Sequence, residues 1–120
     1  MATPTSYPRV SYERALIKGV DSTPKLLLGV DTSTWVMNNI SVCNTSENDI
    51  RINFYTLEID NPENNFFEYN VLIPVNTSKE FSYSKTFLSG DIIYGYSDNN
   101  YNTFDCHISY VRLLETSDNL

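Results

Sequence analysis

The only histidine of the chain, His107, directly follows Asp105 and Cys106, and all three residue types serve in catalysis and metal binding. Neighbouring side chains of a strand point to opposite faces, so Cys106 cannot share a face with the other two. Asp105 and His107 can share one, but a zinc site needs three or four ligands. We therefore predict a structural role for this triplet, with no catalytic residue and no metal site.

Carboxylates are the other groups with chemical potential. Glu58, Asp60 and Glu63 lie close together in the sequence, and a pair of carboxylates at a suitable separation can hydrolyse glycosides. Acidic residues near turns and strand ends are, however, typical of a solvated surface. Gly90 and Gly95 belong to no G-x-G-x-x-G phosphate-binding motif. We expect no cofactor and no cofactor-binding residue.

The nine tyrosines allow two interpretations. A large ring with a polar tip suits the core and rim of a β-sheet, and it also suits a contact surface. In the second interpretation, Tyr94, Tyr96, Tyr101 and Tyr110 form a stacking platform for sugar rings or for a partner protein. The candidate residues for partner contact are Tyr7, Tyr12, Asn64, Asn65, Phe66, Tyr94, Tyr96 and Tyr101.

Composition and charge restrict the class of protein. The chain has 120 residues, 41% of them apolar, which is enough for one core and too little for two. Its net charge of −7 repels phosphate backbones and argues against a nucleic-acid partner. No apolar run approaches the roughly eighteen residues of a membrane helix, and the first residues do not resemble a signal peptide. We expect no membrane partner and synthesis in a reducing cytoplasm, where Cys43 and Cys106 are buried thiols rather than a disulfide.

The residue pattern predicts strands and no substantial helix. Aromatic and β-branched residues are frequent, and Asn, Asp, Ser and Gly interrupt them at short intervals. Alternation of apolar and polar residues indicates about eight strands. These are residues 15–20, 25–30, 34–43, 49–57, 68–75, a strand around 81–83, 91–96 and 103–114.

Two of these segments carry specific predictions about their faces. In 49–57, Ile50, Ile52 and Phe54 alternate with Arg51, Asn53 and Tyr55, which is typical of a half-buried strand. In 34–43, strict alternation places Val36, Ile40 and Val42 on one face and Trp35, Met37 and Cys43 on the other. That arrangement predicts a strand covered on both faces.

Short strands without intervening helices predict an all-β fold, an antiparallel two-sheet sandwich that is Ig-like or jelly-roll-like. The antibody hallmark is missing, because Trp35 precedes Cys43 and Phe104 stands where a tyrosine is required. We expect three regions and one projecting loop. They are an extended N-terminal arm at 1–14, the sandwich domain at 15–115, a C-terminal tail at 116–120, and a polar loop at 60–65.

Four phrases occur together in this chain: TWVMNNISVCNTS at 34–46, IPVNTS at 73–78, LSGDII at 88–93 and ISYV at 108–111. In this order they resemble a group of small virion structural proteins of tailed bacteriophages, especially phages of marine bacteria. The resemblance covers about residues 15 to 115, and Arg112 departs from it, since an acidic residue is usual there. It implies a non-enzymatic β-sandwich that attaches to a capsid, neck or tail.

Two hypotheses of different classes follow. The first is a homo-oligomeric structural protein of a phage virion, which contacts other virion proteins as a capsid decoration or at the neck or tail. Its contacts would come from the N-terminal arm and from the loops at 60–65 and 97–102. The second is a receptor- or glycan-binding adhesion module, indicated by the tyrosines and by loop tips rich in Asn and Asp. An enzyme is the third and weakest interpretation.

Overall fold

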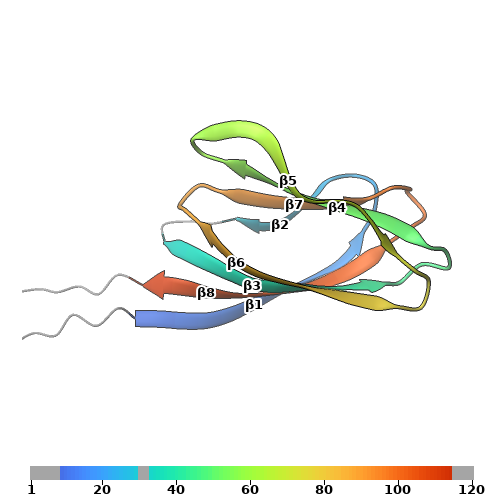
Figure 1. The fold of residues 1–120 in the computed structure, drawn as a ribbon, viewed down its shortest axis with the longest axis horizontal. Coiled ribbons are helices and arrows are strands. Elements are labelled where there is room, and N and C mark those ends of the chain that lie inside the picture. Colours follow the sequence, from blue (N-terminus) through green and yellow to red (C-terminus); the bar gives the residue numbers. More distant parts are fainter. Residues whose placement is uncertain (1–8, 30–32, 115–120) are drawn as a thin grey trace, which may run out of the picture.

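The fold was analysed in a computed structural model that describes residues 9–29 and 33–114. Every regular element in this part of the chain is a β-strand, and none of it forms a helix that could cross a membrane (Figure 1). The prediction of an all-β fold with about eight strands is confirmed. The strands are β1 (Arg9–Val20), β2 (Lys25–Gly29), β3 (Thr34–Asn44), β4 (Ile50–Glu58), β5 (Asn61–Ile73), β6 (Ser78–Phe87), β7 (Ile92–Ser97) and β8 (Phe104–Leu114).

The strands form two antiparallel sheets of four, packed face to face as the two layers of a sandwich (Figure 1). One sheet has the order β1-β8-β3-β6 and the other has the order β2-β7-β4-β5. The first strand thus pairs with the last, the second with the seventh, the third with the sixth and the fourth with the fifth. This nested pairing is a jelly roll. The jelly-roll-like alternative is therefore correct, and the Ig-like one is wrong, because an Ig sheet places its first strand beside its second.

The first strand begins earlier than the sequence pattern indicated. Residues 9–14, which we expected to belong to an extended arm, are part of β1 and pair with the end of β8, as in Tyr12 opposite Val111. Backbone pairing does not require apolar side chains on both faces, so a strand can continue through residues such as Glu13 and Arg14. The rest of the expected arm, 1–8, and the tail at 116–120 lie outside the described residues.

The expected loop at 60–65 is wrong for the same reason. Strand β5 begins at Asn61, and only Ile59 and Asp60 form the turn that joins it to β4. Pairing continues to the tip of this hairpin, where Glu58 lies opposite Asn61. The polar segment that reads as a loop is thus the beginning of a strand.

A β-bulge in β3 overturns the prediction for its faces. The register of β3 shifts between Met37 and Asn39 against both neighbouring strands, and against β8 Asn38 is the extra residue. The bulge reverses the alternation, so that Trp35, Met37, Ile40 and Val42 all turn to the core, whereas Val36 is not part of it. Met37, Ile40 and Val42 are fully buried, whereas Cys43 is exposed. The strand is not covered on both faces.

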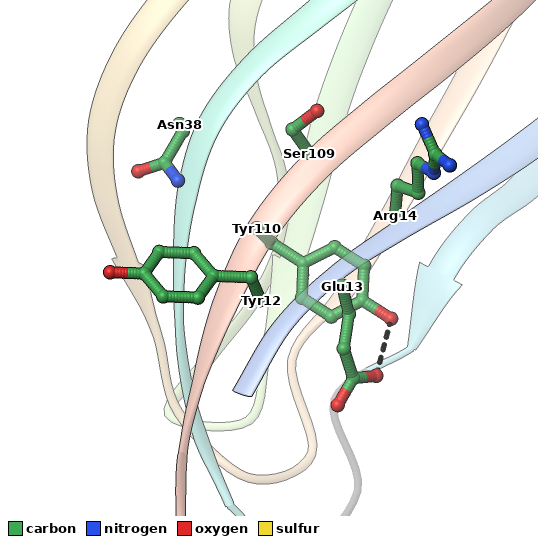
Figure 2. Close-up of a pocket in the computed structure, with 6 residues that line it drawn as sticks. All are labelled: Tyr12, Glu13, Arg14, Asn38, Ser109 and Tyr110. Atoms are coloured by element: carbon green, nitrogen blue, oxygen red, sulfur yellow. Dashed lines mark hydrogen bonds between the residues drawn. The ribbon is translucent and has the colours of Figure 1, made fainter. Parts of the chain in front are cut away.

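A polar cluster fastens β1 to β8 at one end of the core. The Tyr110 hydroxyl donates a hydrogen bond to Oε1 of Glu13 at 3.1 Å (Figure 2), and Arg112 Nη2 lies 3.2 Å from the same oxygen. The ring of Tyr110 stacks on Trp35 with centroids 4.4 Å apart, and the Arg112 guanidinium lies 5.4 Å from the Trp35 ring. Arg112 thus covers the core tryptophan.

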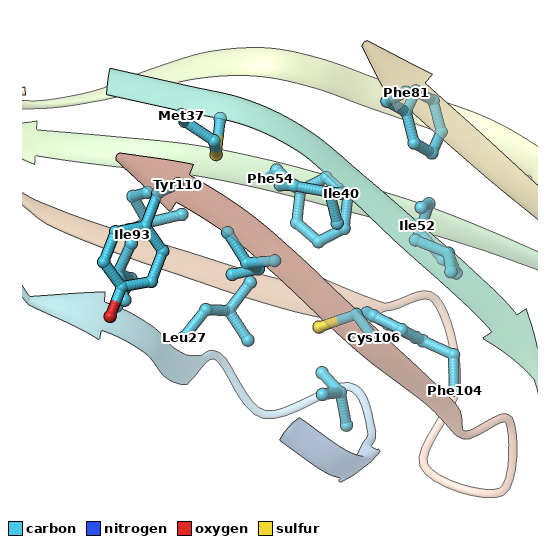
Figure 3. Close-up of a cluster of buried hydrophobic side chains, with 14 of the residues drawn as sticks. Leu27, Met37, Ile40, Ile52, Phe54, Phe81, Ile93, Phe104, Cys106 and Tyr110 are labelled. Carbon is cyan, nitrogen blue, oxygen red and sulfur yellow. The ribbon is translucent and has the colours of Figure 1, made fainter. Parts of the chain in front are cut away.

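Aromatic rings join the two sheets in the middle of the core. Phe54 of β4 makes edge-to-face contacts with Phe81 of β6 and Phe104 of β8, with centroids 6.1 and 6.0 Å apart (Figure 3). Gly95 of β7 lies against this ring. A Cβ added to Gly95 would lie 2.9 Å from side-chain atoms of Phe54 and Leu27. The close approach of β7 to the core therefore requires glycine at this position.

We predict that Gly95→Ala destabilises the fold by about 1–3 kcal/mol, because the added methyl group overpacks the core beside Phe54. Gly29→Ala is the matched control, since a Cβ there meets no atom within 4 Å. Urea unfolding followed by the fluorescence of Trp35 measures both variants. Equal unfolding midpoints for the two would contradict this account of the core.

Candidate interaction surfaces

The Asp-Cys-His triplet is split between two faces, as the alternation predicts. Cys106 is fully buried in the core, whereas Asp105 and His107 lie on the outer face of β8. Asp105 Oδ1 accepts a hydrogen bond of 2.9 Å from the backbone N–H of Gly19, at the bulge of β1. His107 lies between Leu16 and Ser41 in the register of the sheet. Within 9–29 and 33–114, no three His, Cys, Asp or Glu side chains gather as a metal site would require.

The two cysteines lie on neighbouring strands but on opposite faces. Cys106 is opposite Val42, so Cys43 is one position away in the register and points outward. Both thiols are free, as expected, but Cys43 is exposed, and its expected burial is wrong. The cause is the bulge at Asn38, which sets the phase of β3. Burial, with a smaller contribution from Asp105, raises the pKa of the Cys106 thiol to about 12.

Five aromatic rings gather on the outer face of the β2-β7-β4-β5 sheet, and we call them the outer aromatic cluster. Tyr55 of β4 is its centre, 5.3 Å from Phe66 of β5 and 5.3 Å from Tyr94 of β7, measured between centroids. Tyr96 lies 6.2 Å from Tyr55, and Tyr69 lies 5.1 Å from Phe66. Three adjacent strands position these rings, and Tyr94 and Phe66 lie directly opposite Tyr55 in the register.

This cluster covers a face that was predicted to be exposed. On β4, Tyr55 and Asn53 are each only 7% exposed, so the half-buried strand of the prediction is covered on both faces over part of its length. Asn53 Oδ1 accepts a 2.9 Å hydrogen bond from the N–H of Asn70. Asn70 has a φ of 55°, in the left-handed region that asparagine tolerates, and it lies in a stretch of β5 where the register shifts. The irregular β5 brings its aromatic rings over β4.

The cluster has a buried base and an exposed rim. Tyr69 is 68% exposed and Phe66 is 41% exposed, so the rim is formed by β5. Burial raises the pKa of the Tyr55 and Tyr96 phenols, which are therefore neutral at physiological pH. The surface offers ring faces and neutral hydroxyl groups, and these suit stacking and hydrogen bonding rather than acid–base chemistry.

The sequence-predicted contact residues are only partly brought together. Phe66, Tyr94 and Tyr96 meet in the outer aromatic cluster, and Asn64 and Asn65 lie at the beginning of β5, beside it. Tyr101 is 86% exposed in the loop between β7 and β8 and makes no ring contact with any residue that the structure describes. The remaining members of the predicted set are in other places. Tyr12 lies on β1, Tyr110 packs in the core against Trp35 and so is no part of a platform, and Tyr7 lies outside the described residues.

Sequence reasoning missed Tyr55 and Tyr69. The alternation of Arg51, Asn53 and Tyr55 already placed Tyr55 on the outer face of its strand. A tyrosine there, followed by Phe66 in the next strand, was the available signal. The shifts in register along β5 hid the position of Tyr69.

A second surface lies along β1, at the edge of the other sheet. Tyr12 and Arg14 of β1, Asn38 of the β3 bulge and Ser109 of β8 line a surface hollow of about 420 Å³ (Figure 2). A second hollow of about 480 Å³ adjoins it at Arg14 and extends along Leu16 and His107. Tyr12 is 81% exposed and Leu16 is 54% exposed. An exposed edge strand with apolar side chains is a typical site of association with another chain.

Comparisons with known proteins show the fold. The sequence matches no family model and no curated protein. A chain of Bacillus endospore appendages, described as disulfide-linked pili, has a TM-score of 0.56 at 10% identity, covering 97% of this chain and 96% of that chain. A chain from the capsid structure of Helicobacter pylori bacteriophage KHP30 has a TM-score of 0.53 at 12% identity, covering 93% and 94%. A chain of infectious bursal disease virus, Gx strain, has a TM-score of 0.55 at 10% identity, covering 96% of this chain and 35% of that chain.

We predict that the native protein has one reactive thiol. Cys43 is exposed and reacts with a thiol reagent such as DTNB, whereas Cys106 is protected by burial and by its raised pKa. Titration at pH 8 should give one thiol per chain in buffer and two in denaturant. Cys43→Ser should abolish the native reaction without changing the unfolding midpoint, and two reactive thiols in the native protein would contradict the placement of Cys106.

Proposed function

We propose that this chain is a non-enzymatic structural protein of a virus particle, present in many copies and in contact with other virion proteins. The observation that carries this proposal is the match of nearly the whole jelly roll to chains of a phage capsid and of a bacterial pilus. Both neighbours build assemblies of many copies. Jelly rolls also occur in lectins, so the surfaces of this chain must support the choice.

The surfaces of the chain favour association over catalysis. Exposed apolar side chains occur on both sheets, with Tyr12 and Leu16 on β1 and with Phe66 and Tyr69 on β5. The Asp-Cys-His triplet, the strongest catalytic candidate of the sequence, is divided between the core and the outer face. The exposed apolar surfaces, which suit association with other proteins, are therefore better candidates for the functional region than a catalytic site.

The four-phrase resemblance adds a finer proposal, that the particle is a tailed bacteriophage. The chain would then be made in the host cytoplasm and dock on the capsid as a decoration, or on the neck or tail. Three of the four phrases fall at turns or strand ends of the fold, at 44–46, 74–78 and 88–91. Tyr7, which lies outside the described residues, would be one of the chain's contact residues.

Mass spectrometry of gradient-purified particles tests this proposal, with heads and tails separated. We expect peptides of this chain in stoichiometric amounts with the major structural proteins of one fraction. Recovery with heads would identify a capsid component, and recovery with tails a neck or tail component. Absence from both fractions would reject the virion proposal.

The outer aromatic cluster favours glycan binding as a second candidate function. Exposed ring faces stack on the apolar faces of sugar rings, and the hydroxyl groups of Tyr69 and Tyr94 provide hydrogen-bonding groups beside them. The two functions are compatible, because a component on the surface of a particle can also bind a cell surface.

If the cluster binds glycans, a glycan array should show selective binding, and Tyr69→Ala should weaken that binding at least tenfold because the most exposed ring of the cluster is lost. Tyr12→Ala is the matched control, an even more exposed tyrosine on the opposite sheet. The absence of saccharide binding by the unaltered protein, or equal losses in the two variants, would reject this second function.

A further inference from the structure

Charge is distributed unevenly along this acidic chain. The segment 9–25 contains four of the eight cationic residues and two of the fifteen carboxylates, a balance of +2. The remaining residues contain four cations and thirteen carboxylates, a balance of −9. The basic segment comprises β1, the turn that follows it and Lys25, the first residue of β2, so this segment differs in sign from the rest of the chain.

Two cations of β1, Arg14 and Lys18, point outward. Glu13, the carboxylate within β1, points to the other face of the sheet and pairs with Arg112. Arg14 and Lys18 are exposed and form no ion pair with any residue in the described part of the chain. They alternate with exposed Tyr12 and Leu16, and the two surface hollows flank Arg14. We call these four outward side chains the β1 face.

Negative charge is concentrated on the β4–β5 hairpin. Glu58, Asp60 and Glu63 surround its tip, and no Lys or Arg occurs between Arg51 and Lys79. These three carboxylates form no ion pair within the described residues, and Ile59, which is 65% exposed, lies among them. The tip of the hairpin projects from the sandwich, as the light green ribbon in Figure 1 shows, and its Ile59 N–H is held by Asp91 Oδ1 at 3.2 Å. We call this tip, residues 58–63, the acidic tip.

The β1 face and the acidic tip lie on opposite sides of the sandwich. Strands β1 and β2 are neighbours at one side, where Lys25 Nζ donates a hydrogen bond to the carbonyl oxygen of Lys18. Strands β5 and β6 are neighbours at the other side, where the Phe67 and Tyr83 rings are 5.5 Å apart and Tyr83 donates a hydrogen bond to Glu68. One molecule therefore cannot bring its own two surfaces together, but two molecules can.

We propose that the β1 face of one copy binds the acidic tip of the next copy. Arg14 and Lys18 then neutralise carboxylates of the tip, and Ile59 covers the apolar side chains of the β1 face. The contact is heterologous, because it joins two different surfaces, and repetition of it builds a ring or a row. This inference rests on the proposed role as a multi-copy structural protein and identifies the surfaces that join neighbouring copies.

A charge swap tests the contact directly. One variant carries Arg14→Glu and Lys18→Glu, and the other carries Asp60→Lys and Glu63→Lys; all four positions are exposed, so both variants should fold. Self-association is measured by analytical ultracentrifugation at low ionic strength. We expect each variant alone to associate at least tenfold more weakly than the unaltered chain, because like charges then face each other. The two variants mixed should associate again, since each surface of one then meets its complement on the other.

Two further measurements complete the design. Glu47→Lys with Asp98→Lys makes the same change in net charge as the Asp60→Lys and Glu63→Lys variant, at exposed positions that belong to neither surface, and should leave association unchanged. Association of the unaltered chain should weaken as salt rises to about 1 M, where screening acts within about 3 Å. An unaltered chain that stays monomeric, variants that associate normally, or a mixture that does not recover would each overturn the contact. If the contact is overturned but the chain is recovered from purified particles, the proposed structural role in the virion still holds. If the chain is absent from particles, the structural role is rejected as well.

Discussion

The jelly roll closes where its first strand pairs with its last, and the other features of the molecule depend on that pairing. Strand β1 is held to β8 along nearly its whole length, from the pair Arg9 and Leu114 to the bulge near Gly19. The polar cluster of Glu13, Tyr110 and Arg112 adds a charge-assisted link between the two strands. Because Arg112 also lies over Trp35, this link and the closure of the core form together. Such non-local pairing must overcome the entropy of closing a loop of almost the whole chain.

The same pairing leaves β1 as an edge strand, since β8 already uses its other side to pair with β3. An edge strand has unpaired backbone groups, and proteins commonly shield such edges with charged side chains. Here, Arg14 and Lys18 provide the charges, but Tyr12 and Leu16 add apolar surface between them. This combination prevents indiscriminate pairing with another edge strand and still permits binding to a surface of opposite charge. The edge strand is thus protected from backbone pairing with other edge strands but remains accessible to an acidic surface.

Alternation along the sequence was sufficient to predict the number of strands and the two-sheet architecture. Alternation did not predict which face of a strand a side chain occupies wherever a bulge shifts the pattern by one residue. One extra residue at Asn38 moves Ile40 and Val42 to the face already occupied by Trp35 and Met37, and no local composition marks that change. Three rings of the outer aromatic cluster, Phe66, Tyr94 and Tyr96, were among the candidate contact residues of the sequence, although their grouping around Tyr55 was not predicted. Its centre, Tyr55, was missed because its burial depends on strands β5 and β7, whose register the sequence does not reveal.

A net charge of −7 and the proposed contact between copies place opposing demands on one small domain. Mutual repulsion keeps free copies soluble, yet it also opposes any contact between two copies. Concentrating half of the cations in β1 and β2 resolves this opposition, because it makes one orientation of approach favourable while the mean charge remains negative. A single contact of this kind is weak when it is exposed to solvent. In an assembly of many copies, however, each contact holds its neighbours in place for the next, so weak and specific contacts are sufficient for a stable structure.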